Sequence, residues 1–175
     1  MLTKVHTATM VGLRGARVEV EVDLGPGFPA FIIVGLPDKA VEEARERIRA
    51  AVKNAGLEFP SSRRITVNLA PADLPKEGPS YDLPMTAGIL IGAYSLSFDP
   101  RESFFMGEVA LDGTLRHTSG ILPMAIFARE SGVHTVYVPA CDAAEAALVR
   151  GISVIGVRDI AELLQHLKGE KTISP

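Results

Sequence analysis

One stretch of the sequence, RITVNLAPADLPKEGPSYDLPMTAGIL at Arg64–Leu90, joins three kinds of local structure. Its first part, Arg64–Leu69, predicts a β-strand. The next part, Ala70–Tyr81, is rich in proline and glycine and predicts a loop. Asp82 is placed to cap a helix, and the first turn of that helix tolerates Pro84. Because this helix is apolar almost all round, we expect it to be buried.

The residues before this stretch predict a strand-rich start followed by one helix. Valine alternates with acidic residues within Ala16–Leu24, which is the period of a half-buried strand, and Lys4–Leu13 is expected to pair with it as a hairpin. Phe31–Val34 is a short apolar run that predicts a third strand. Apolar residues then recur every three or four positions from Asp38 to Ala55, which predicts an amphipathic helix capped by Asp38.

The residues after the stretch alternate between predicted strands and helices. In chain order we expect a strand at Phe104–Leu111, a turn at Asp112–Gly113 into Thr114–His117, a helix at Met124–Ser131, a strand at His134–Val138, a helix at Asp142–Val149, a strand at Ser153–Val157 and a helix at Asp159–Leu167. Lys168–Pro175 is polar and predicts a tail or the start of a linker. The whole pattern predicts an α+β sandwich with helices packed on a sheet.

Composition places the chain among ordinary globular proteins. Its 175 residues fit one domain, and 47% of them are hydrophobic and 22% charged. No uncharged run is long enough for a membrane helix, and the start has no signal-like apolar region, so we expect no membrane partner and a cytoplasmic location. The single cysteine, Cys141, excludes an internal disulfide and is expected to be a small buried residue.

Charge and motifs limit the chemistry of the chain. The net charge of −3 lacks the strong basic excess of many nucleic-acid domains. The phosphate-binding pattern G-x-x-x-x-G-K-[ST] is absent, so we expect no ATP bound by such a loop. The four histidines have no metal-ligand spacing, so no metal site is expected.

The proline-rich loop is the first candidate site. Its marked residues are Lys76, Gly78, Ser80 and Asp82. Ser80 stands just before a predicted helix, where free backbone N–H groups stabilise an oxyanion. The alternative is a proline-stiffened connection in which Asp82 only caps the helix.

The second candidate site is a basic face. The arginines that are expected to contact phosphate are Arg45, Arg49, Arg63 and Arg64. Arg45 and Arg49 share one side of the predicted helix. Acidic residues interleave with them, and Glu43 and Arg47 form an i, i+4 pair, so a solvated salt-bridged face is the alternative.

Two segments carry a family resemblance that covers most of residues 3–167. VGLPDKAVEEARERIRAA at Val34–Ala51 and the stretch at Arg64–Leu90 resemble the N-terminal domain of magnesium-chelatase-like AAA+ proteins of the competence protein ComM type. The resemblance implies a domain over residues 1–168 and a tail or linker over 169–175 that leads to an absent AAA+ ATPase module. It further implies that the protein assembles as a hexamer, in which this domain contacts that module and the neighbouring subunits. The absent module is implied to bind ATP and magnesium. In this family, DNA branch migration during natural transformation is the implied process, so DNA is a possible partner.

A more distant resemblance concerns proteases. KEGPS at Lys76–Ser80 is similar to the nucleophile loop of Lon-type proteases, and Met106–Pro139 is similar to the Lon segment that carries the catalytic lysine and to the C-terminal domain of RadA. This implies the fold of the second domain of the small-subunit ribosomal protein S-five, a mixed sheet with helices packed on it.

The Lon resemblance places Ser80 at the nucleophile and Leu122 at the lysine. Leucine cannot take a proton from a hydroxyl, so we expect no catalytic residue in this chain. The leading hypothesis is therefore a non-catalytic accessory domain of a hexameric AAA+ ATPase, with an enzyme only in the full-length protein. The alternatives are a Lon-like serine peptidase with Ser80 as nucleophile and a chaperone-type peptide-binding module. Insertion of metal into a porphyrin is the least supported, since nothing here supplies such a site.

Overall fold

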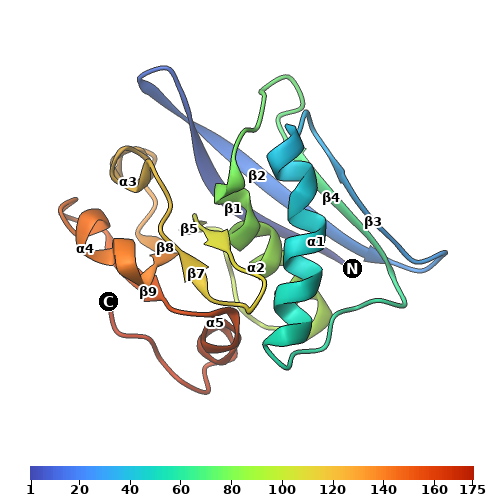
Figure 1. Ribbon diagram of the computed structural model, residues 1–175. Helices are drawn as coiled ribbons and strands as arrows, with labels where there is room; N and C mark the ends of the chain where they lie inside the picture. Colours follow the sequence, from blue (N-terminus) through green and yellow to red (C-terminus); the bar gives the residue numbers. More distant parts are fainter.

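The computed structural model describes residues 1–175 and contains a seven-stranded mixed sheet (Figure 1). The strand order is β3-β4-β2-β1-β5-β8-β9, and the strands are β1 (Leu2–Val11), β2 (Arg14–Gly25), β3 (Ala30–Val34), β4 (Arg64–Ala70), β5 (Ser103–Phe105), β8 (Thr135–Pro139) and β9 (Ser153–Val157). Strand β2 pairs antiparallel with β1 and β4, and all other neighbours in the sheet pair in parallel. A separate two-stranded sheet consists of β6 (Glu108–Val109) and β7 (Leu115–Arg116).

Helices cover the sheet in two groups. They are α1 (Lys39–Asn54), α2 (Asp82–Ala93), α3 (Ile121–Glu130), α4 (Ala143–Ala146) and α5 (Ile160–Leu167), with single 3-10 turns at η1 (Pro79–Tyr81) and η2 (Ala140–Asp142). The larger core joins α1, α2 and α5 to the sheet, and the smaller core joins α3 and α4 to its β5-β8-β9 end. Adjacent residues of β5 enter different cores, Phe104 the smaller and Phe105 the larger, because successive strand residues face opposite sides.

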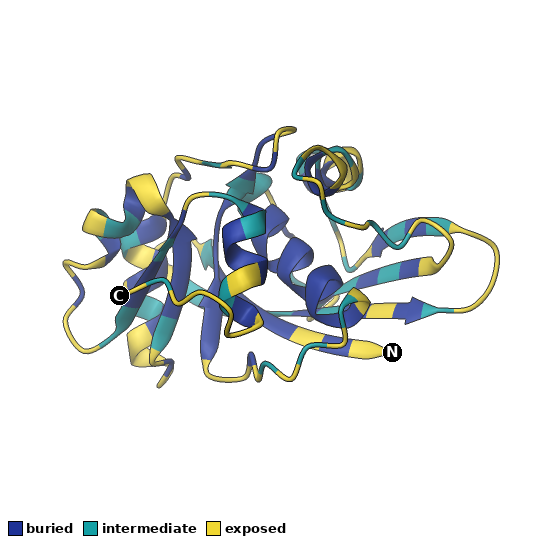
Figure 2. Ribbon diagram, turned by 90° about the horizontal axis from the view of Figure 1, so that it is seen from below, coloured by how far each residue is buried: buried dark blue, intermediate teal, exposed yellow.

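The predicted α+β sandwich is confirmed. Helix α2 is buried from Asp82 to Gly92, as its apolar sequence predicts, and Figure 2 shows how the exposed residues concentrate in the connecting segments and on outer helix faces. Asp38 caps α1 as expected, since its side chain accepts from Val41 N, and Asp159 caps α5 in the same way by accepting from Glu162 N.

Several predicted elements need correction. The strand expected at Phe104–Leu111 is two strands, β5 and β6, because after the last β5–β8 bond, from Met106 N to Tyr137 O, Gly107 N donates to Ser80 O of the proline-rich loop. Helix α3 begins at Ile121, three residues before the predicted Met124, after Gly120 adopts a left-handed conformation with φ 83°. The helix expected at Asp142–Val149 is only the four-residue α4, preceded by η2.

The C-terminal residues lie against the domain. Ile173 packs on the larger core, and its backbone N–H donates to His166 Nδ1 at 2.9 Å. None of the helices combines the length and the apolar character needed to cross a membrane.

Candidate functional site

The proline-rich loop, residues 71–80, is fastened to the segment between β3 and α1. The Lys76 side chain is buried and donates through Nζ to the carbonyl oxygens of Gly35, at 2.7 Å, and of Pro71. Burial lowers the pKa of Lys76 below its ordinary value. Lys76 therefore holds the loop in place and does not face solvent.

Asp38 forms a further hydrogen bond with the same loop. One carboxylate oxygen caps α1 by accepting from Val41 N at 2.7 Å, and the other accepts from Gly78 N at 3.1 Å. Gly78 has φ 82°, a left-handed conformation that glycine adopts without strain. One aspartate thus joins the start of a helix to the loop before Ser80.

Asp82 corrects the sequence prediction, because its side chain does not cap α2. It is fully buried and forms a bidentate ion pair with Arg47 of α1, at 2.8 and 2.9 Å, and also accepts from Val109 N. Burial raises the pKa of Asp82, against the opposing effect of Arg47, and the carboxylate raises the pKa of Arg47. Three 3-10 residues precede Asp82, so the first turn leaves its carboxylate free to reach across to α1.

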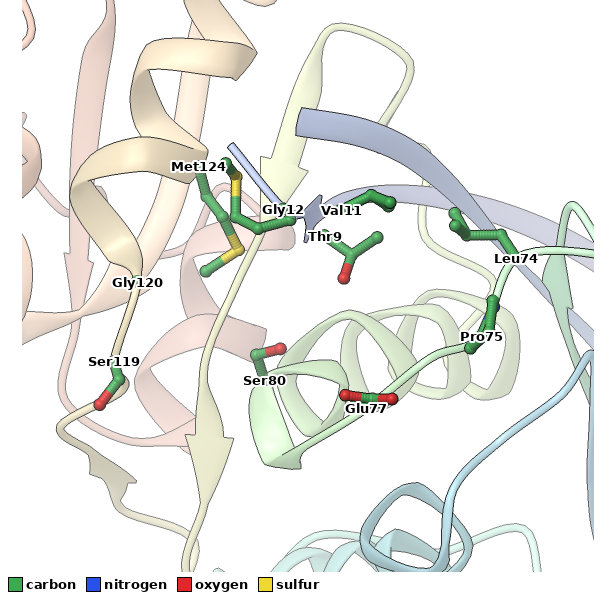
Figure 3. A pocket seen from close by; sticks show the side chains of 11 residues that line it. Thr9, Val11, Gly12, Leu74, Pro75, Glu77, Ser80, Ser119, Gly120 and Met124 are labelled. Carbon is green, nitrogen blue, oxygen red and sulfur yellow. The ribbon is translucent and has the colours of Figure 1, made fainter. Parts of the chain in front are cut away.

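Ser80 lines a hollow beside this loop, with a cavity volume of about 520 Å³. We call it the serine hollow. Figure 3 shows Ser80 and Glu77 on one side, Thr9 and Val11 opposite them, and Met124 at a third side. The walls come from the end of β1, the proline-rich loop and the segment Ser119–Met124, which are far apart in the sequence.

Few polar or ionisable side chains line the serine hollow. Glu77 is the only ionisable side chain in its lining, and the polar groups are the hydroxyls of Thr9, Ser80 and Ser119. Leu122 lies in the first turn of α3 next to this lining, but packs on the smaller core, and its N–H donates to Glu145. The structure therefore brings the Lon-like serine and the segment of the Lon-like lysine to one hollow without an amine in its wall.

A second hollow gathers two of the predicted arginines. Arg49 of α1 and Arg63 before β4 line a cavity of about 100 Å³ together with Phe59, and we call it the basic hollow. The Arg49 guanidinium lies 5.9 Å from the centre of the Phe59 ring, which orients it. Arg49 also forms an ion pair with Glu46 at 3.6 Å, and Arg63 also borders the neighbouring hollow at the N-terminus.

The other two predicted arginines lie outside this lining. Arg64 is exposed at the first position of β4, directly after Arg63. Arg45 turns back on its own helix, where Nε donates to the carbonyl oxygen of Glu42 at 3.1 Å. The helical spacing of Arg45 and Arg49 therefore does not bring both to one hollow.

Sequence reasoning missed a histidine–aspartate pair. His117 Nδ1 lies 2.5 Å from Oδ1 of the buried Asp142, whose other oxygen accepts from Thr118 N. Asp142 raises the pKa of His117. The two residues are 25 positions apart with no shared pattern, so only the fold could reveal them.

Cys141 corrects another expectation, because it is exposed. The chain turns at η2 directly after β8, and there Asp142 points inward while Cys141 faces solvent. Phe28, at the β2–β3 turn, is 87% exposed and was not singled out from the sequence.

No metal site accompanies these hollows. Across the 175 residues, His, Cys, Asp and Glu side chains nowhere gather in threes that could hold a metal ion.

Comparison with known proteins identifies relatives of the chain. It is 40% identical over 169 residues to an uncharacterized protein of Mycobacterium tuberculosis, which covers 96% of this chain and 33% of that protein. It is 39% identical over 173 residues to competence protein ComM of Haemophilus influenzae, covering 98% of this chain and 34% of ComM. Lon protease 2 of Bacillus subtilis is more distant, at 28% identity over 124 residues, or 70% of this chain and 22% of the protease.

These matches confirm the resemblances drawn from the residues. The chain spans about a third of the length of these two curated relatives, the mycobacterial protein and ComM. The family model for subunit ChlI of Mg-chelatase matches residues 20–142, well over half of the chain. The chain therefore belongs to the family of the ChlI subunit of Mg-chelatase.

Proposed function

We propose that this chain is the N-terminal accessory domain of an AAA+ ATPase. The relatives are about three times as long, so two thirds of such a protein lie outside this domain. ATP and magnesium are assigned to that further module, because the present chain carries no phosphate-binding loop and no group of metal ligands. The assembly is a cytoplasmic hexamer in which this domain supports the ring and performs no catalysis itself.

The basic hollow is assigned to DNA. The observation that supports this assignment is that Arg49 and Arg63, from different elements, line one cavity beside Phe59. Exposed arginines that converge from two elements suit the phosphates of a nucleic-acid backbone, and such contacts do not depend on base sequence. ComM carries the name of a competence protein, which agrees with a role on DNA during natural transformation.

The test is the salt dependence of DNA binding by the chain, measured by fluorescence anisotropy on duplex and four-way-junction DNA. Arg49→Ala/Arg63→Ala should weaken binding to both and make the slope of log K against log salt shallower by about 1.8, since each lost phosphate contact removes about 0.9. The matched control is Arg129→Ala/Arg150→Ala, which removes two exposed arginines that lie outside the basic hollow. Equal slopes for the two double variants would show that the arginines of the basic hollow do not contact DNA.

A serine hydrolase is the second candidate, because Ser80 lines the serine hollow and Lon protease 2 is a relative. Against it, the lining holds no lysine or histidine to take the proton of the hydroxyl. A fluorophosphonate probe should therefore leave Ser80 unmodified in a mass spectrum. An adduct on Ser80 that is lost in Ser80→Ala would favour the hydrolase.

A further inference from the structure

The serine hollow has no part in the proposed function, and it lies where the sheet is incomplete. Strand β5 pairs with β1 only at Phe104 and His6, whereas β1 continues to Val11. Met106 N still donates to Tyr137 O of β8, but the next residue, Gly107, donates through N to Ser80 O, so the chain turns away from β1 after β5. The last residues of β1 therefore have a strand neighbour on the β2 side only.

This open side of β1 faces the serine hollow. Thr9, Met10, Val11 and Gly12 form one wall of the hollow, and Ser119–Met124 and the proline-rich loop form the others (Figure 3). A strand edge presents unpaired backbone N–H and C=O groups, which is how extended peptides are recognised in proteins. Ala8 is buried in the smaller core, so the open edge begins at Thr9, and the three residues from Thr9 to Val11 offer about 10 Å of it at 3.3 Å per residue.

We propose that the serine hollow binds an extended polypeptide segment, added to β1 as a strand in line with β5. The backbone of the segment pairs with β1, and its apolar side chains contact Met10 and Met124. Methionine side chains are flexible and adapt to different partners, so this contact tolerates varied apolar residues.

The negative charge in the serine hollow favours a segment that carries a basic residue. Glu77 is exposed and is the only ionisable side chain in the lining, so a lysine or arginine of the segment pairs with it. The absence of a cation from the lining disfavours a nucleic acid, whose phosphates need one. The fastening of the loop by Lys76 and Asp38 keeps this wall in place before the ligand arrives.

The test uses a fluorescein-labelled octapeptide of alternating threonine and valine with one central lysine. Its binding to the 175-residue chain is measured by fluorescence anisotropy. The chain should bind this peptide, and a version N-methylated at alternate residues should bind at least about tenfold more weakly, because two or more backbone hydrogen bonds are lost. Glu77→Gln should weaken the lysine peptide about threefold to fivefold and leave a glutamine version unchanged. Ser119→Trp should fill the hollow and abolish binding, whereas Ser131→Trp, at an exposed position outside it, should not.

Hydrogen exchange gives the location of the bound peptide. The peptide should protect the amides of residues 9–12 and leave those of β3 and β9, the two outer edges of the sheet, unchanged. Absence of binding, equal binding of the N-methylated peptide, protection of β3 instead of β1, or displacement of the peptide by oligothymidylate would each overturn the proposal. None of these outcomes depends on the basic hollow, so the assignment to DNA is tested separately.

Discussion

At the scale of single residues, Arg47 and Asp82 are the pair on which the packing of α1 against α2 depends. Asp82 is fully buried, and Arg47 supplies both of its short charged contacts as well as a bond to the carbonyl oxygen of Ala40. Removing one partner of such a pair leaves a buried charge without compensation. Arg47→Ala should therefore lower the free energy of unfolding by about 3 kcal/mol in a urea titration.

Arg45→Ala is the matched control, since Arg45 bonds only to a carbonyl oxygen of its own helix. It should change the free energy of unfolding by less than about 0.5 kcal/mol. Equal losses for the two variants would show that the contact with Asp82 adds nothing to stability.

The pairing of His117 with Asp142 predicts that the stability of the fold depends on pH. Asp142 raises the pKa of His117 above its ordinary value of 6.5, so the folded state binds the proton more tightly than the unfolded state. The stabilisation is fully present below the unfolded pKa and is lost as pH rises through the folded pKa. The stability difference between the parent and His117→Gln should thus be largest near pH 5 and shrink by about pH 8 in thermal unfolding. A difference that stays constant across this range would contradict the pairing.

At the scale of elements, the connection between β3 and α1 depends on Gly35. Gly35 has φ 101°, and a Cβ atom built on it would lie 2.1 Å from the carbonyl oxygen of Leu69 on β4. Gly35→Ala should lower the free energy of unfolding by more than about 2 kcal/mol, because the backbone of β4 must shift. Gly132→Ala is the control, with φ 76° and open space around it, and should cost only about 1 kcal/mol. Equal costs would show that the close approach is relieved easily.

The elements also show what local patterns can predict. Helix α1 follows from a three-to-four-residue period and β2 from a two-residue period, β1 follows from its hairpin with β2, and β3 and α2 follow from their apolar sequences. The division of Phe104–Leu111 into β5 and β6 could not be predicted, because it follows from the hydrogen bond of Gly107 N to the carbonyl oxygen of Ser80, a residue distant in the sequence. The side chain of Asp82 likewise follows from the position of Arg47, which no local pattern gives.

At the scale of the whole molecule, both hollows join segments that are distant in the sequence. The resemblance marked Ser80, but the residues that face it from β1 and α3 come from the topology of the sheet. Arg49 and Arg63 were marked by charge, and the structure brings them to one hollow while Arg45 bonds within its helix. Contact of these arginines with DNA stays a prediction.

We propose above all that this chain is the first domain of a longer AAA+ protein. The most direct test is the intact mass of the natural gene product, together with its sequence beyond residue 175. We predict a mass roughly three times the 18.7 kDa of this chain, with a G-x-x-x-x-G-K-[ST] loop in the added part. A product that ends near Pro175, or a continuation without that loop, would contradict the claim and leave the serine hollow as the leading functional site.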